Sequence, residues 1–141
     1  MTQQDQAEEI VDAFEMFDNW EDRYRFLIDM GKKLPPLPED AKNEENRVHG
    51  CQSNVWMIAE ATEEGGNTKI EFIADSDSTI VRGLVAILRM VYSGQTPRDI
   101  LEFDIDGLMT KLGLDQHLSL GRRNGLAGMV TRVKTLATQL A

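Results

Sequence analysis

Residues 54–78, NVWMIAEATEEGGNTKIEFIADSDS, restrict the possible folds more than any other part of this sequence. A run rich in β-forming residues leads to the Gly65–Gly66 pair, and a second run follows in which the two faces of a strand differ. One face would carry only apolar side chains and the other mostly polar ones, namely Ile70, Phe72 and Ala74 against Lys69, Glu71 and Ile73. The segment therefore predicts a β-hairpin with one face toward a core.

Helical patterns precede this hairpin. Apolar residues recur at helical spacing between Gln6 and Phe17, and Asp18 is expected to cap a second helix that ends near Gly31. Residues 34–45 begin with a proline-rich run that cannot be helical, which predicts an extended polar connection. The chain before the hairpin is therefore expected to form two helices and a linker.

Helical patterns also follow the hairpin. Ser76–Ser78 offers capping side chains for an apolar helix that Gly94 ends, and this helix is expected to be the most buried one. A short helix is expected from a cap at Asp104 or Asp106 to a stop at Gly113. The last helix carries apolar residues three or four positions apart through Leu140.

This segregated order of helices, strands and helices predicts an α+β fold. We expect a small antiparallel sheet of about three strands, with helices packed on one face. A short strand through Arg47 and Val48 would supply the third strand. At 141 residues, the chain is expected to form one domain over residues 1–141.

The charges are unevenly distributed along the chain. Residues 1–66 hold 16 acidic and 6 basic residues, the whole chain has a formal net charge of -9, and no acidic residue follows Asp115. An acidic surface repels phosphates, so nucleic-acid binding is not expected. The N-terminus does not resemble a signal peptide and no run is long enough to span a membrane, so a soluble, cytoplasmic protein without membrane contact is expected.

Cys51 is the only cysteine. A lone cysteine is commonly a small buried hydrophobic residue, but Gly50 precedes this one and polar residues, beginning with Gln52, follow it where a loop enters the hairpin. This context favours an accessible thiol. A reactive thiol needs nearby donors or positive charge to become a thiolate, and Arg47 and His49 are the local candidates.

Other uses of the thiol fit the sequence less well. One cysteine and two histidines, His49 and His117, are too few for a structural zinc site or an iron–sulfur scaffold, so no metal site is expected. A cysteine hydrolase could pair Cys51 with either histidine, oriented by Asp75 or Asp77. No oxyanion-hole signature accompanies these residues.

Arg122 and Arg123 place positive charge where the last helix is expected to start. This end of a helix is already the positive end of its dipole, so both arginines carry a small cost. A solvated helix face is the common explanation for such charges. A recognition role for one of the arginines is the alternative.

The residues around Cys51, RVHGCQSNVW, resemble the active-cysteine signature of the SufE family of sulfur acceptor proteins. ADSDSTIVRGLVAILRMVYSGQTPRDI, FDIDGLMTKLGLDQHLS and RRNGLAGMV follow in the order of that family, and the similarity covers about residues 10–138. The resemblance implies a fold similar to the IscU scaffolds. It also implies that Cys51 accepts persulfide sulfur from a SufS-type cysteine desulfurase, stimulates that enzyme and passes the sulfur to a Suf-type iron–sulfur scaffold.

By this resemblance the protein is an accessory carrier and not an independent enzyme, with no cofactor of its own and pyridoxal phosphate only in its partner. Arg47, His49, Gly50 and Gln52 would support the thiol or the partner contact. Arg122 or its neighbour Arg123 would contact the desulfurase. In the family, the loop that carries the cysteine covers an apolar cavity.

A monomer or homodimer is expected. Two functions are alternatives to sulfur delivery for iron–sulfur clusters. One is a relay protein for tRNA thiolation or molybdenum cofactor, and the other is a desulfurase regulator that carries no sulfur.

Overall fold

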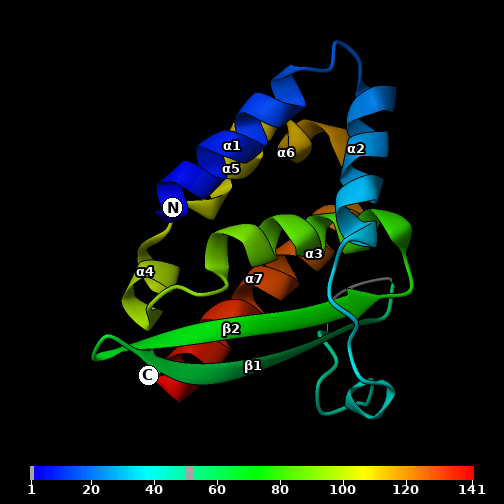
Figure 1. Ribbon diagram of the computed structural model, residues 1–141. Helices are drawn as coiled ribbons and strands as arrows, with labels where there is room; N and C mark the ends of the chain where they lie inside the picture. The colour runs from blue at the N-terminus through cyan, green and yellow to red at the C-terminus, as the bar shows by residue number, and fades with distance from the viewer. Residues whose placement is uncertain (1, 50–52) are drawn as a thin grey trace.

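The computed structural model describes residues 2–49 and 53–141. It is an α+β structure in which one β-hairpin lies along one side of the helices (Figure 1). The elements are α1 (Gln3–Glu15), α2 (Trp20–Lys32), the 3₁₀ turn η1 (Glu39–Ala41), β1 (Val55–Glu64), β2 (Asn67–Ser76), α3 (Thr79–Tyr92), α4 (Pro97–Glu102), α5 (Ile105–Leu112), α6 (Leu114–His117) and α7 (Leu120–Leu140). The expected fold class is confirmed.

The hairpin forms where the sequence places it. Gly65 and Gly66 have φ of 60° and 83°, which a two-residue turn of this kind requires. The register pairs Met57 with Ala74, and both side chains are buried on the same face as Phe72. The alternation in the sequence therefore sets which face of the sheet packs on the helices.

The sheet has two strands within residues 2–49 and 53–141, so the expectation of about three is wrong in number. Arg47 forms only an isolated bridge with Trp56. The Val48 N–H donates to the Val55 carbonyl at 2.8 Å, and the Met57 N–H donates to the Asn46 carbonyl at 2.9 Å. A turn closed by the Asn46 N–H and the Asn43 side chain immediately precedes these residues, which leaves too little chain for a full strand.

Most helix ends lie where the sequence predicts them. The structure differs from the predictions in three places: the cap of α2, the linker after α2 and the chain after α5. Asn19, and not Asp18, caps α2, because its side-chain oxygen accepts the Asp22 N–H at 2.9 Å. Residues 34–45 are not extended throughout, since η1 forms one turn after the prolines. The short α6 follows Gly113, which ends α5 with φ of 74° as expected. Of the capping residues that the sequence offers, Ser78 caps α3 and Asp104, not Asp106, caps α5.

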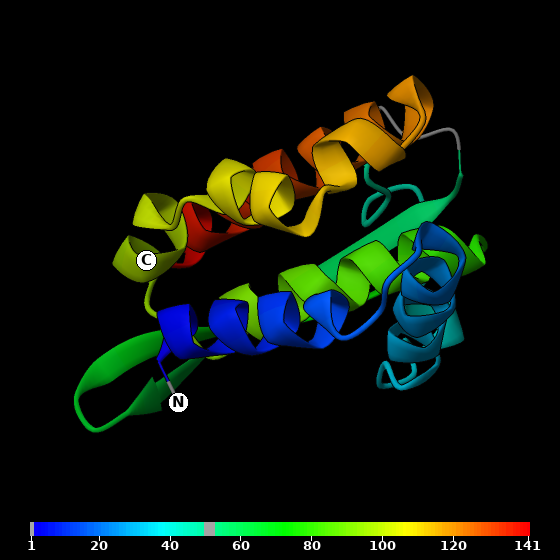
Figure 2. The same ribbon diagram turned by 90° about the horizontal axis from the view of Figure 1, so that it is seen from above.

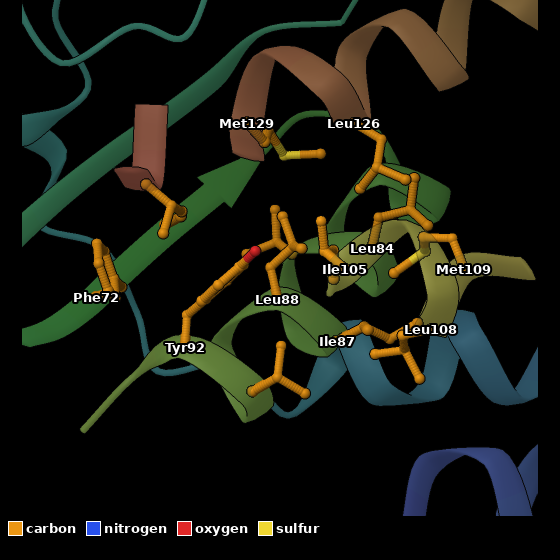
Figure 3. Packing of buried hydrophobic residues seen from close by; sticks show 14 of the residues in the cluster. Phe72, Leu84, Ile87, Leu88, Tyr92, Ile105, Leu108, Met109, Leu126 and Met129 are labelled. Carbon is orange, nitrogen blue, oxygen red and sulfur yellow. The ribbon is translucent and has the colours of Figure 1, made fainter. Parts of the chain in front are cut away.

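Helix α3 is the centre of the core. Figure 2 shows it between α1 on one side and α7 on the other. Its buried side chains pack with residues from β2, α5 and α7, as Figure 3 shows for Leu84, Leu88, Phe72, Met109 and Met129. The sequence correctly identifies α3 as the most buried helix.

Helices α2 and α3 cross at two glycines. A Cβ on Gly83 would lie 2.4 Å from the Leu27 carbonyl oxygen, and a Cβ on Gly31 would lie 2.7 Å from the Gly83 nitrogen. These distances are shorter than van der Waals contact, so the crossing requires both glycines. No helix within the described ranges is long and apolar enough to cross a bilayer.

Candidate functional site

Three of the predicted site residues, Gly50, Cys51 and Gln52, lie outside the described residues. The chain on either side of them is described as far as His49 and Ser53. The site is therefore built from these two arms and from the elements that hold them.

The arm before Cys51 rests on α7. The His49 carbonyl oxygen lies 2.8 Å from the position of a Cβ on Gly128, so the backbone approaches the helix as closely as a glycine allows. Arg132 Nη2 donates to the Glu45 carbonyl at 3.1 Å, and the side chain of Val48 is buried. Gly128 and Arg132 are not among the predicted site residues. The sequence signals for them are the RRNGLAGMV motif, which contains Gly128, and the basic stretch without acids after Asp115, which contains Arg132.

The arm after Cys51 is fixed by Asp77. The carboxylate of Asp77 accepts the Asn54 backbone N–H at 3.1 Å and the Asn54 side-chain amide at 2.9 Å. The Asp77 N–H donates back to the Asn54 carbonyl at 3.3 Å. The capping function expected for Ser76–Ser78 is performed by Ser78, which leaves the Asp77 carboxylate to hold this arm.

Arg47 and His49 both face the same carboxylate. Arg47 Nη1 lies 3.5 Å from one oxygen of Glu44, and His49 Nε2 lies 3.6 Å from the other. Their side chains are 39% and 72% exposed. Such exposed pairs are weak, so a partner protein can compete for either side chain.

A cavity of about 210 Å³ lies between the second arm and the start of α7. Its apolar side chains come from α3 and α7, and Ser53, Ser119 and Arg122 add polar groups. Among the described residues, the lining consists of Ser53, Val81, Ser119, Gly121, Arg122, Gly125, Leu126 and Met129. We call this cavity the Arg122 pocket.

The charge around the Arg122 pocket is positive. Ser119 caps α7, and its hydroxyl accepts the Arg122 N–H at 3.3 Å. The first turn of α7 contains no acidic residue. The helix dipole and the Arg122 guanidinium therefore add at this end of the helix and favour an anion nearby.

Arg123 lies over a different depression. Its Nη1 donates to the Asp115 carbonyl at 3.4 Å, and it lines a groove of about 350 Å³ with residues of α5 and α6 that include Met109 and Leu114. Neighbouring residues of an α-helix point about 100° apart. The structure thus places only Arg122, of the two predicted arginines, beside Ser53.

The residues of a cysteine hydrolase are not assembled in the described part of the chain. His117 stacks on Trp20 with ring centroids 3.8 Å apart, and its backbone carbonyl accepts the Tyr24 hydroxyl. Asp75 pairs with Lys42 and Arg82 at 3.6 and 3.0 Å, and Asp77 holds Asn54. Neither candidate histidine contacts either candidate aspartate among these residues.

No group of three or more potential metal-ligating side chains occurs within residues 2–49 and 53–141. Burial raises the pKa of the Tyr92 hydroxyl, but Tyr92 belongs to the core and does not line the Arg122 pocket.

The fold and site together define a small α+β protein with a single cysteine. In the sequence, this cysteine lies between an arm that packs on α7 and an arm that lies beside the Arg122 pocket.

The family model of the SufE Fe–S metabolism associated domain matches residues 8–137, so the chain belongs to the SufE family. An uncharacterized SufE-like protein of Rhizobium meliloti (strain 1021) is 44% identical over 130 residues, which cover 92% of this chain and 93% of the relative. Another from Rhizobium etli is 43% identical over 127 residues, covering 90% and 86%.

The fold also matches a solved structure. The solution structure of a hypothetical protein from Thermus thermophilus has a TM-score of 0.73, with 24% identity over 96% of this chain and 95% of that one. This similarity supports the fold alone. Membership of the SufE family confirms the resemblance drawn from the motifs, and it gives the protein a role in iron–sulfur metabolism with a cysteine desulfurase as its general partner.

Proposed function

We propose that Cys51 accepts persulfide sulfur from a SufS-type cysteine desulfurase, stimulates that enzyme and delivers the sulfur to a Suf-type iron–sulfur scaffold. The observation that carries this proposal is the Arg122 pocket, which is lined both by Ser53, two residues after the only cysteine, and by the positive end of α7. The family assignment supports the partner class.

The transfer needs only the thiol and the partner's persulfide. The Cys51 thiolate attacks the terminal sulfur of the donor, a new S–S bond forms on Cys51, and the donor's S–S bond breaks. The donor cysteine leaves as a thiolate and takes up the proton that Cys51 released. No external oxidant or reductant is consumed.

The positive charge near Ser53 has a role in this scheme. Both the attacking thiolate and the persulfide that forms are anions, which positive charge and helix N–H groups stabilise. The Arg122 guanidinium and the first turn of α7 supply both. The pocket also has the apolar side chains of Val81, Leu126 and Met129 beside these polar groups.

We further propose that the protein acts in the cytoplasm as a carrier without a cofactor or metal of its own. Pyridoxal phosphate then belongs to the desulfurase. A monomer or homodimer presents one Cys51 per chain to one partner active site.

Intact-mass measurement tests the central proposal. The protein is incubated with a purified SufS-type desulfurase and free cysteine, and its mass should rise by one sulfur atom that a reducing agent removes. No mass increase with a desulfurase that is active by itself would refute sulfur acceptance. Stimulation without the increase would instead support a regulator.

Arg122→Ala should weaken stimulation of the desulfurase about tenfold, measured as the protein concentration for half-maximal alanine release, because a charged contact at an interface centre is lost. Arg123→Ala is the matched control, since Arg123 faces the groove of α5 and α6. Equal losses in the two variants would contradict the assignment to Arg122. Unaltered stimulation in both would remove α7 from the interface.

A further inference from the structure

The two edges of the hairpin differ in how their backbone groups are satisfied. In this register, Ile70 and Phe72 direct their backbone groups away from β1. The Ile70 N–H donates to the Gln95 carbonyl at 2.9 Å, and its carbonyl accepts the Gly94 N–H at 2.7 Å. The Phe72 N–H and carbonyl pair with the side chains of Ser93 and Arg89. The edge of β2 is covered along these residues.

Among the described residues, the edge of β1 is covered only over its first three residues, 55–57. Val55 and Met57 pair with Val48 and Asn46. Ala59, Ala61 and Glu63 direct their backbone groups to the same side, and no hydrogen bond from the described residues reaches them. We call these three positions the open edge. An unpaired edge is a template for an added strand.

Acidic side chains surround the open edge. Glu60 lies directly opposite Glu71 on the solvent face of the hairpin, an arrangement in which like charges repel. Glu63 and Glu64 follow, and Lys69 is the only base between Glu60 and Glu71. Lys69 lies 3.9 Å from Glu64, so Glu60 has no cation beside it among the described residues.

We propose that the open edge binds an extended, basic segment of a partner protein as an added β-strand. Backbone N–H and C=O groups of Ala59, Ala61 and Glu63 would pair with the segment. Lysine or arginine at alternate positions of the segment would lie on the solvent face beside Glu60 and relieve its repulsion with Glu71. A second copy of the chain would bring the same acids and add to the repulsion.

This surface is separate from the Arg122 pocket. Strand β1 has 10 residues and spans about 30 Å at the usual rise of a strand. The pocket lies at the Val55 end, whereas Figures 1 and 2 both show the hairpin turn at the far end of the molecule. The two surfaces can therefore be occupied at the same time, and the inference does not depend on Cys51.

A short synthetic peptide in which lysine and valine alternate tests the proposal by NMR on the full chain. The peptide should slow amide exchange at Ala59, Ala61 and Glu63, with affinity that falls as salt is added. Thr68, which faces outward from β2, should show no protection. A matched peptide with glutamate in place of lysine should not bind.

Two variants separate the backbone contribution from the charge contribution. Ala61→Pro should weaken the lysine peptide at least about tenfold, because it removes an outward N–H while leaving the hairpin's own ladder intact. Glu60→Lys should weaken it about fivefold and raise Tm, because it replaces a repulsive cross-strand pair with an attractive one. Glu15→Lys, which makes the same charge change on α1, is the control and should bind normally.

The proposal can be tested even if Ala61→Pro does not fold, because the amide exchange of the unmodified protein and the binding of Glu60→Lys do not depend on that variant. Unprotected edge amides, or equal binding of the two peptides, would overturn the proposal. Protection of the same amides by raising the protein concentration without peptide would assign the open edge to a second copy instead, and would also overturn it.

Discussion

Cys51→Ser should take up no sulfur and should leave the desulfurase at its rate without an acceptor. A hydroxyl does not ionise near neutral pH and does not attack a sulfane sulfur, so the step that regenerates the desulfurase is lost completely. Intact mass and alanine release measure the two effects on the same samples. This is the largest change in activity that we expect from any single substitution.

Ser53→Ala is the matched control for this experiment, because it alters the Arg122 pocket two residues from Cys51 without removing the thiol. It should retain sulfur uptake. If Cys51→Ser stimulates the desulfurase as well as the unmodified protein does, the protein is a regulator and not a carrier. If Ser53→Ala also loses uptake, the Ser53 hydroxyl takes part in the transfer.

Gly83→Ala should destabilise the protein by about 2 kcal/mol, even after the gain in helix propensity from replacing glycine. The added Cβ would lie 2.4 Å from the Leu27 carbonyl oxygen, and backbone at a helix crossing cannot move as a side-chain tip can. Thermal or urea unfolding followed by circular dichroism measures the loss, which corresponds to several degrees in Tm.

Gly65→Ala provides the comparison with Gly83→Ala. No atom lies within 4 Å of a Cβ on Gly65, although its φ of 60° disfavours alanine, so its cost should be only about 1 kcal/mol. A smaller loss for Gly83→Ala than for Gly65→Ala would show that α2 moves away from α3 without difficulty. The crossing would then not depend on close approach.

The elements that local patterns determine could be predicted from the sequence. The hairpin follows from alternation and a two-glycine turn, and the caps at Ser78 and Asp104 follow from residues beside their own helices. The prediction of a third strand is wrong because the length of that strand depends on how the chain turns at Asn43 and Asn46. Asp18 and Asn19 are both suitable caps, and only the backbone path selects Asn19.

The surroundings of the candidate site could be predicted only in part. Local context makes Cys51 and the arginine pair candidates, and the motif resemblance implies a role for them. The contacts that hold the two arms join residues far apart in sequence, such as Glu45 with Arg132 and Asn54 with Asp77. Local patterns do not encode such pairs. The choice of Arg122 over Arg123 also requires the orientation of α7 against Ser53.

The pairing of Arg47 with Glu44 also affects how a charged partner approaches. Glu44 balances the charge of Arg47, and Glu45 lies next to Glu44 in the sequence, so residues 43–49 carry no excess positive charge. Among the described residues of the site, the positive charge that would attract an anionic group lies on the α7 side, at Arg122 and the first turn of the helix. In the proposed transfer, a persulfide would therefore be attracted toward this side of the site, and its orientation would be selected before any close contact forms.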